Sequence, residues 1–237
     1  MASSSGTDAQ RRSLRWSAAL LIGGFVLNAA VTMLFHPSGD EDNHEVIFTR
    51  YAHSASWEWV HLAQFVGVLL ALAGLLLLYP VLRPRSHNLA LCAAGLTIAT
   101  AAGWSVLQAV DGIALKQAVD AWTDATGAER AIRLADAETV RWTEWGVQSY
   151  VRVAFGLALL VYGAAILVAR AFSGWTGWVA VLAGALSTAW GVDVGYSGLE
   201  SSFQQIASPV FNATVAAFAV GVAVASRGVG DRTRVAR

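Results

Sequence analysis

The sequence predicts an all-α integral membrane protein, a polytopic bundle of six transmembrane helices with an extracytoplasmic helical hairpin between the third and fourth spans. Three observations predict this fold class. Of the 237 residues, 56% are hydrophobic and 14% are charged, whereas soluble domains carry about a quarter charged residues. Apolar runs long enough to cross a bilayer recur along the chain. Arginine and tryptophan gather near the ends of these runs, as is typical of membrane proteins.

Six apolar runs each supply the roughly 20 residues that a helix needs to cross the hydrocarbon core. They cover residues 16–35, 57–82, 88–110, 147–169, 175–194 and 205–226. We expect a tail of residues 1–15, a membrane domain of residues 16–226 and a second tail of residues 227–237. The first run follows three arginines, so a cleaved signal peptide is the alternative to an uncleaved first helix, although the run is longer than a usual signal core.

The basic residues predict that both termini are cytoplasmic. In this orientation the inner side holds ten arginines, and the outer side holds six basic residues with most of the acids. Orientation follows the bias of lysine and arginine near the ends of the spans. We therefore expect a multi-pass protein of the cell membrane with the lipid bilayer as its surroundings. The formal net charge is zero, and we expect no nucleic-acid partner.

The connections between the spans differ in character. Prolines at positions 80 and 84 indicate a short basic turn between the second and third spans, because proline is common where a helix has ended. Residues 36–56 form an acidic segment that carries histidines, and we expect it to be a loop. Residues 111–146 are mostly helical in pattern, and Gly127 interrupts them. This segment is the predicted hairpin, which leads into a long fourth helix.

The fourth helix carries a polar stripe. Arg141, Glu144, Gln148 and Arg152 are spaced so that they share one face of an α-helix. The face enters the membrane, where polar side chains generally point at protein or water rather than at lipid. The alternative without a functional role is a solvent-exposed helix face on which the Arg152 side chain extends to the lipid head groups.

Polar residues at a similar depth occur on other spans. They are Asn28, His61, Gln64, Gln108 and Asn212. With the stripe, they predict an outward-facing polar vestibule that binds a small molecule, ion or partner. Its candidate binding residues are Asn28, His61, Gln64, Glu144, Gln148 and Arg152. Separate interhelical hydrogen bonds are the alternative explanation for each of them.

Two other classes of function stay open. The five histidines, several beside acids, permit a metal- or haem-dependent enzyme or redox protein. His53 and His61 are eight residues apart, about 12 Å along a helix, which is too far for one ion. No HExxH or CxxCH motif is present. A transporter is the second alternative, although the inner half lacks a polar path and no inverted repeat is evident. The sequence assigns no catalytic residue and no cofactor.

Glycines recur every seven residues in three of the spans. Gly177, Gly184 and Gly191 lie in the fifth span, Gly198 follows seven residues later, and shorter series occur in the second and fourth spans. Such a stripe of small residues lets neighbouring helices approach closely. We therefore expect these glycines to line helix-packing seams.

Four segments together resemble a known group of proteins. They are Phe35-His36-Pro37, Tyr51-Ala52-His53-Ser54, Trp57-x-x-Val60-His61-Leu62-x-Gln64-Phe65 and Ala137-Glu138-x-Val140-Arg141-Trp142-x-Glu144-Trp145-Gly146. The pattern is similar, across most of the chain, to uncharacterised multi-pass membrane proteins common in actinobacteria. This resemblance implies the membrane class, and it implies no activity.

Overall fold

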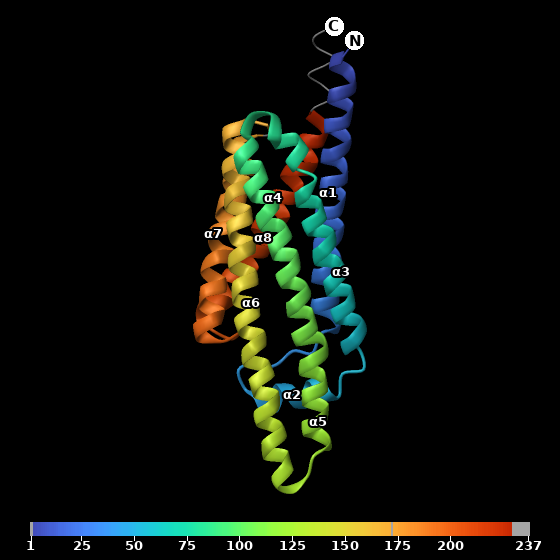
Figure 1. The fold of residues 1–237 in the computed structure, drawn as a ribbon, viewed down its shortest axis with the longest axis vertical. Coiled ribbons are helices and arrows are strands. Elements are labelled where there is room, and N and C mark those ends of the chain that lie inside the picture. Colours follow the sequence, from blue (N-terminus) through green and yellow to red (C-terminus); the bar gives the residue numbers. More distant parts are fainter. Residues whose placement is uncertain (1, 172, 229–237) are drawn as a thin grey trace.

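The computed structural model describes residues 2–171 and 173–228, and the regular elements within this part of the chain are helices. The elements are α1 (Ala2–Phe35), α2 (His44–Ala52), α3 (Trp57–Leu76), α4 (Tyr79–Ala109), the π-helical turn η1 (Val110–Leu115), α5 (Lys116–Asp124), α6 (Gly127–Ala169), α7 (Gly174–Ser197) and α8 (Ser202–Gly228). Figure 1 shows the long helices running nearly parallel to the long axis.

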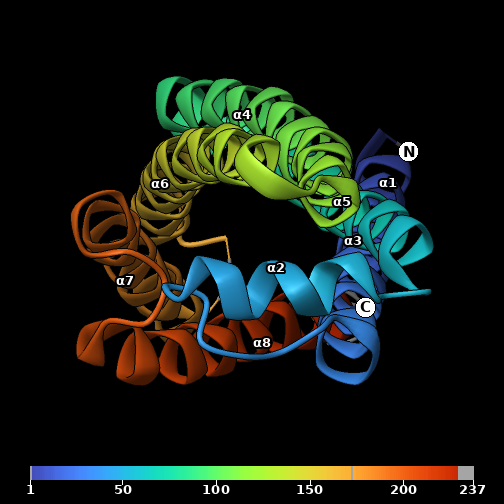
Figure 2. The ribbon, with the colours of Figure 1, turned by 90° about the horizontal axis from the view of Figure 1, so that it is seen from below.

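The six long helices form a closed ring. Each packs against its two neighbours in the order α1, α3, α4, α6, α7, α8 and back to α1, and Figure 2 shows this arrangement along the axis. The chain termini lie at one end of the ring (Figure 1). The opposite end, hereafter the distal end, carries α2 and the hairpin formed by α5 and the first turns of α6.

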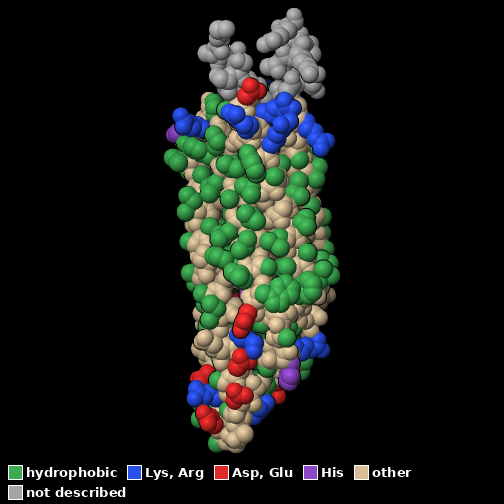
Figure 3. All heavy atoms as spheres, turned by 90° about the vertical axis from the view of Figure 1, so that its right-hand side faces the viewer, with side chains coloured by type: hydrophobic (Ala, Val, Ile, Leu, Met, Phe, Trp, Pro, Cys, Tyr) green, Lys and Arg blue, Asp and Glu red, His purple; other side chains and the backbone are tan. Residues whose placement is uncertain are grey.

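The described residues include six helices long and apolar enough to cross a membrane. They confirm the predicted all-α, six-span fold. Figure 3 shows hydrophobic side chains covering the middle of one face, with basic residues above them and mixed charges at the distal end. Exposed apolar surface of this extent is expected where lipid, rather than water, surrounds the protein.

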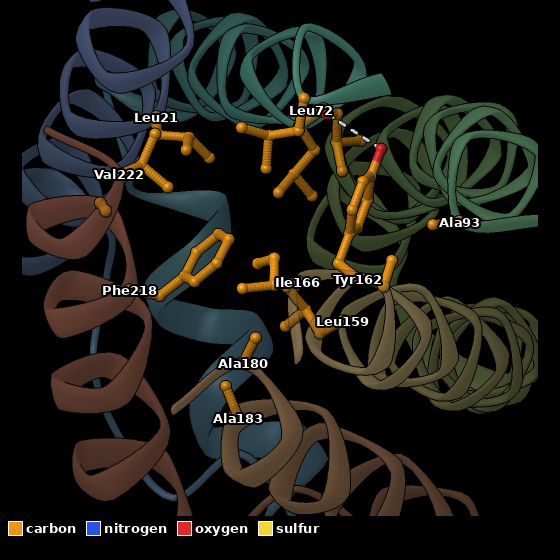
Figure 4. Packing of buried hydrophobic residues seen from close by; sticks show 14 of the residues in the cluster. Leu21, Leu72, Ala93, Leu159, Tyr162, Ile166, Ala180, Ala183, Phe218 and Val222 are labelled. Atoms are coloured by element: carbon orange, nitrogen blue, oxygen red, sulfur yellow. Dashed lines mark hydrogen bonds between the residues drawn. The ribbon is translucent and has the colours of Figure 1, made fainter. Parts of the chain in front are cut away.

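The core lies inside the ring. Leu159, Tyr162 and Ile166 of α6 point inward toward Leu72 of α3 and Phe218 of α8 (Figure 4). The hydroxyl of Tyr162 donates a hydrogen bond of 2.9 Å to the carbonyl oxygen of Leu75. The side chains of α6 therefore contact α3 in the half of the ring nearer the chain termini.

The glycine seams are confirmed. A Cβ atom on Gly184 would lie 2.6 Å from the carbonyl oxygen of Gly156, and one on Gly191 would lie 2.7 Å from that of Ser149. Gly67 and Gly74 make the same kind of approach to α1. Gly198 is different, because it ends α7 with a φ of 77° and faces Asp42.

Two connections differ from the prediction. The turn between the second and third spans consists of residues 77–78, and α4 already begins at Tyr79. Pro80 is tolerated there because the first turn of a helix does not use its backbone N–H groups. Pro84 lies within α4, which kinks at Ser86. Residues 36–56 are not only a loop, since they contain α2, whose first turn is capped by the side chain of Asn43.

Candidate functional site

The segment of residues 36–56, here called the cap, crosses the distal end of the ring (Figure 2). It leaves α1, reaches the connection between α7 and α8, and returns through α2 to α3. The carboxylate of Asp42 accepts hydrogen bonds from the backbone N–H groups of Leu199, at 2.8 Å, and Glu200, at 3.3 Å. Gly198 permits this contact, because a Cβ atom there would lie 2.6 Å from the Asp42 carboxylate.

Apolar side chains attach the cap to the hairpin. They form a second buried core, separate from the core inside the ring, and α2 contributes one of its faces. Its buried members are Ile47, Phe48, Tyr51, Trp57, Leu115, Val119, Trp122 and Ala137. Full burial of such side chains contributes about 1.5–3 kcal/mol each. The cap is therefore a folded part of the distal end.

A buried charge cluster lies beneath the cap. Arg141, whose side chain is 2% exposed, contacts Glu144 of its own helix at 2.5 Å and Glu41 of the cap at 2.6 Å. The hydroxyl of Tyr51 also donates a hydrogen bond to Glu41. Buried charges are costly unless they are paired. One guanidinium thus joins the cap to α6 by satisfying two carboxylates.

A second pair lies on the side of α3. His61 Nε2 is 3.3 Å from a carboxylate oxygen of Asp111, and His61 Nδ1 contacts the carbonyl oxygen of Trp57 at 2.8 Å. His61 Nε2 has no hydrogen-bond partner among the described residues, so the pair with Asp111 is an electrostatic contact. The His36 ring lies 5.4 Å from the His61 ring.

The π-helical turn η1 positions this pair. The Trp57 indole donates a hydrogen bond of 2.9 Å to the carbonyl oxygen of Gly112. A Cβ atom on Gly112 would lie 2.9 Å from the Cβ atom of His61, so a larger residue would push α3 away. Single π-helical turns are frequent at functional sites. Here the turn brings Asp111 and α3 together.

Burial also sets the protonation of two cap residues. It lowers the pKa of His36 below its usual value, although the negative charge of Asp111 opposes this effect. Burial raises the pKa of Tyr51 well above its usual value, although the positive charge of Arg141 opposes this effect. Both side chains are therefore neutral near pH 7.

The six predicted binding residues fall into two groups. Gln64 donates a hydrogen bond of 2.9 Å to the Thr32 hydroxyl, and Asn28 lies one turn away on α1, where it faces Gly67. These contacts join α1 to α3, and His61 lies one turn closer to the distal end than Gln64. Glu144, Gln148 and Arg152 form the second group on α6, together with Arg141.

The members of the α6 group have different surroundings. Glu144 is buried against Arg141. Gln148 is half-buried, and its side chain has no hydrogen bond to another described residue. The guanidinium of Arg152 lies 3.6 Å from the centre of the Trp190 ring. Of the other polar residues, Gln108 is buried whereas Asn212 is exposed on α8.

Sequence reasoning missed several residues of the distal end. Glu41 lies in the acidic segment that carries histidines, and Asp111 lies at the start of the predicted hairpin. Neither of them is a predicted binding residue, and the same holds for Tyr51, Trp57 and Trp190. The spacing of Ile47, Phe48 and Tyr51 after Asn43 is a helical signal that indicates α2. No local signal identifies the partners of the two acids, because each partner lies on another helix.

The surface near the cap contains two hollows. One, of about 400 Å³, is lined mainly by acidic residues of the cap and α6, including the His44–Glu138 pair, whose atoms are 3.1 Å apart. The other, of about 450 Å³, includes Arg50, Trp122 and Arg130. Neither is lined by the six predicted residues. Across residues 2–171 and 173–228, no three histidine, cysteine or acidic side chains are grouped as metal ligands would be.

The fold and the distal end together define a class of protein, a multi-pass helical membrane protein whose spans enclose buried, paired charges beneath a folded cap. The chain belongs to the DUF4386 family, because the model of this family, a domain of unknown function, matches residues 12–226. Neither a curated protein nor a solved structure matches the chain.

Proposed function

We propose that the protein binds a small polar molecule or ion within the distal half of its ring of helices, and that the distal end faces the outside of the cell. The ligand reaches this vestibule past the cap. Binding is the function proposed, with no chemical reaction assigned to the site.

One observation carries the proposal. Besides Arg141 Nε in the charge cluster, four buried polar atoms on α4 and α6 have no hydrogen-bond partner among the described residues. They are Trp104 Nε1, Gln108 Oε1, Trp145 Nε1 and Arg152 Nε. An unpaired buried polar atom costs about 1–3 kcal/mol, so most buried polar atoms in proteins are paired. A polar ligand in this region would satisfy them.

The four atoms lie at a similar height in the ring. Gly103 of α4 is adjacent to the Val151 side chain of α6, and the two helices run in opposite directions. At about 1.5 Å per residue, Gln108 is therefore near the level of Trp145, and Trp104 is near that of Arg152. The charge cluster of Arg141 lies one to three turns closer to the distal end.

The arginines support the proposed orientation. Arg11, Arg12, Arg15, Arg83 and Arg85 belong to helix segments at the end where the chain termini lie, and lysine and arginine favour the cytoplasmic side. Reporter fusions near Asp42 and Gly127 should therefore report the outside, and fusions after Pro84 and Ser226 the cytoplasm. Cytoplasmic activity at Gly127 would reverse the orientation.

Access can be tested with cysteine labelling. Cys92 is the single cysteine of the chain, so Cys92→Ser provides the background. A membrane-impermeant maleimide added to intact cells should label Gln148→Cys on α6. Thr49→Cys, at an exposed position of the cap, is the positive control, and Ala158→Cys, at a fully buried position of α6, is the negative control.

The outcomes separate access from orientation. Labelling at residues 49 and 148 supports a vestibule that opens to the outside. Labelling at residue 49 alone would contradict an open vestibule. Labelling of both only in inside-out vesicles would retain the vestibule and reverse the orientation.

A further inference from the structure

Arg152 points into the ring rather than toward lipid. Leu159 and Ile166 follow it on α6 by seven and fourteen residues and so share its face of the helix. Figure 4 shows both of these side chains directed into the interior. A long side chain on a helix leans toward the N-terminus of that helix, which for α6 is the distal end. The guanidinium therefore lies inside the distal half of the bundle.

The guanidinium has no anionic partner among the described residues. Within that part of the chain, no carboxylate oxygen lies within 4.0 Å of Arg152, whereas Arg141 on the same face contacts two. The Arg152 Nε atom is buried without a hydrogen-bond partner. The side chain is only half-buried although it faces inward, so protein atoms leave part of its surface uncovered.

The guanidinium is also held in a defined place. It lies over the Trp190 ring at 3.6 Å, an arrangement that stabilises a cation. The Trp190 indole donates a hydrogen bond of 3.0 Å to Gln204, and its ring meets Phe211 edge-on. The Ser187 hydroxyl donates a hydrogen bond of 2.8 Å to the Arg152 carbonyl oxygen. The contact of α7 with α6 thus fixes the base of the Arg152 side chain, and the contacts of α7 with α8 fix the Trp190 ring beneath it.

The neighbouring unpaired groups are mostly donors. Besides Arg141 Nε in the charge cluster, the unpaired buried atoms on α4 and α6 are three N–H groups, those of Trp104, Trp145 and Arg152, and one acceptor, Gln108 Oε1. Such a set is complementary to a ligand with several acceptor oxygens. An arginine with free N–H groups binds carboxylate or phosphate through two parallel hydrogen bonds.

We propose that the ligand of the vestibule is an anion whose carboxylate or phosphate group binds to Arg152. This inference rests on the proposed function and specifies its ligand class. The anion has two sources, a soluble molecule from outside the cell or the phosphate of a lipid head group with a net negative charge that enters between helices. The chemistry at Arg152 is the same for both.

The test uses the full chain in detergent. The probes are butyrate, butyramide and butylamine, which differ in the charge of the head group, together with inorganic phosphate, and the readouts are the melting temperature and tryptophan fluorescence. The lipid arm compares nanodiscs of phosphatidylglycerol with nanodiscs of phosphatidylcholine. Butyrate or phosphate should raise the melting temperature if the anion is soluble, and phosphatidylglycerol alone should do so if it is a lipid.

Variants assign the effect to Arg152. Arg152→Gln should weaken anion binding by about 10- to 100-fold, as expected when hydrogen bonds to a charged group are lost. Arg12→Gln, at an exposed position of α1, should leave binding unchanged. Arg152→Lys retains the charge without the planar fork. It should bind with intermediate affinity, and it replaces Arg152→Gln if that variant does not fold.

Three outcomes would overturn the inference. Stabilisation by butyramide or butylamine, without an effect of either anion, would retain the proposed binding function and reject its anionic ligand. Anion binding that is equal in the wild type and both Arg152 variants would place the anion elsewhere. Absence of an effect from every probe and lipid would reject the anion, and cysteine labelling would then decide separately whether the vestibule exists.

Discussion

Replacing Gly184 with alanine should destabilise the bundle by forcing α6 and α7 apart. The new Cβ atom would lie 2.6 Å from the Gly156 carbonyl oxygen and 2.6 Å from the Leu160 backbone nitrogen. Both are backbone atoms, so the helices must separate by about 1 Å, which forfeits a quarter to a half of each contact along the seam. Overpacking of this kind costs about 1–3 kcal/mol.

Gly95→Ala is the matched control. A Cβ atom on Gly95, in the interior of α4, would meet no atom within 4 Å. Both variants gain the same helix propensity of about 1 kcal/mol, so their difference isolates the strain at the seam. Gly184→Ala should therefore be less stable than Gly95→Ala by about 1–3 kcal/mol, measured by thermal unfolding in detergent.

Equal stability of the two variants would refute the reasoning. Gly184→Leu extends the test, because it should lower the melting temperature more than replacement of Leu182, whose side chain is 49% exposed on the same helix. A larger loss at Leu182 would show that the seam is not where the packing is tightest.

The remaining predictions concern the distal end. Arg141→Met should cost about 3–5 kcal/mol because it removes the guanidinium that pairs with the buried Glu144 and the partly buried Glu41. Arg133→Met, which breaks two exposed pairs on the same helix, should cost less than about 1 kcal/mol. Comparable losses in chemical unfolding would contradict burial of the cluster. Trp57→Phe should lose about 1–3 kcal/mol with the hydrogen bond to Gly112, and an unchanged melting temperature would mean that this bond is not formed. The lowered pKa of His36 means that the unfolded chain takes up a proton more readily, so this residue reduces stability as the pH falls from about 6.5 through its lower folded pKa. The melting temperature of the wild type minus that of His36→Gln should thus decrease as the pH falls from 7.5 to 5.5. A constant or rising difference would show that His36 does not cause the pH dependence of stability.

Local patterns were enough to predict the frame of the molecule. The apolar runs correspond to six long helices, because each hydrophobic stretch needs about 20 residues to cross a bilayer regardless of its neighbours. The glycine period predicted the seams at Gly184 and Gly191, because seven residues are close to two helical turns. The polar stripe on α6 followed from the same periodicity.

The candidate site could be predicted only in part. His61 and Arg152 are conspicuous because polar side chains within a span are rare, and Glu144 is a candidate because its spacing places it in the same stripe as Arg152. Their partners were not identified. Glu41 and Arg141 are separated by 100 positions in the chain, and neither carries a local sign that it binds the other.

Sequence alone thus determined the membrane class, the approximate spans, the glycine faces along which helices pack closely, and the level in the membrane at which polar residues occur. Each of these depends on residues within one helix. Tertiary structure alone decided that residues 36–56 fold into a cap, that His61 lies beside Asp111, and that Arg152 rests on Trp190 without a carboxylate partner among the described residues. The physical reason is the range of the interactions. Hydrophobicity and helical period act over a few turns, whereas a buried charge is paired or left unpaired by whichever helix the ring places beside it.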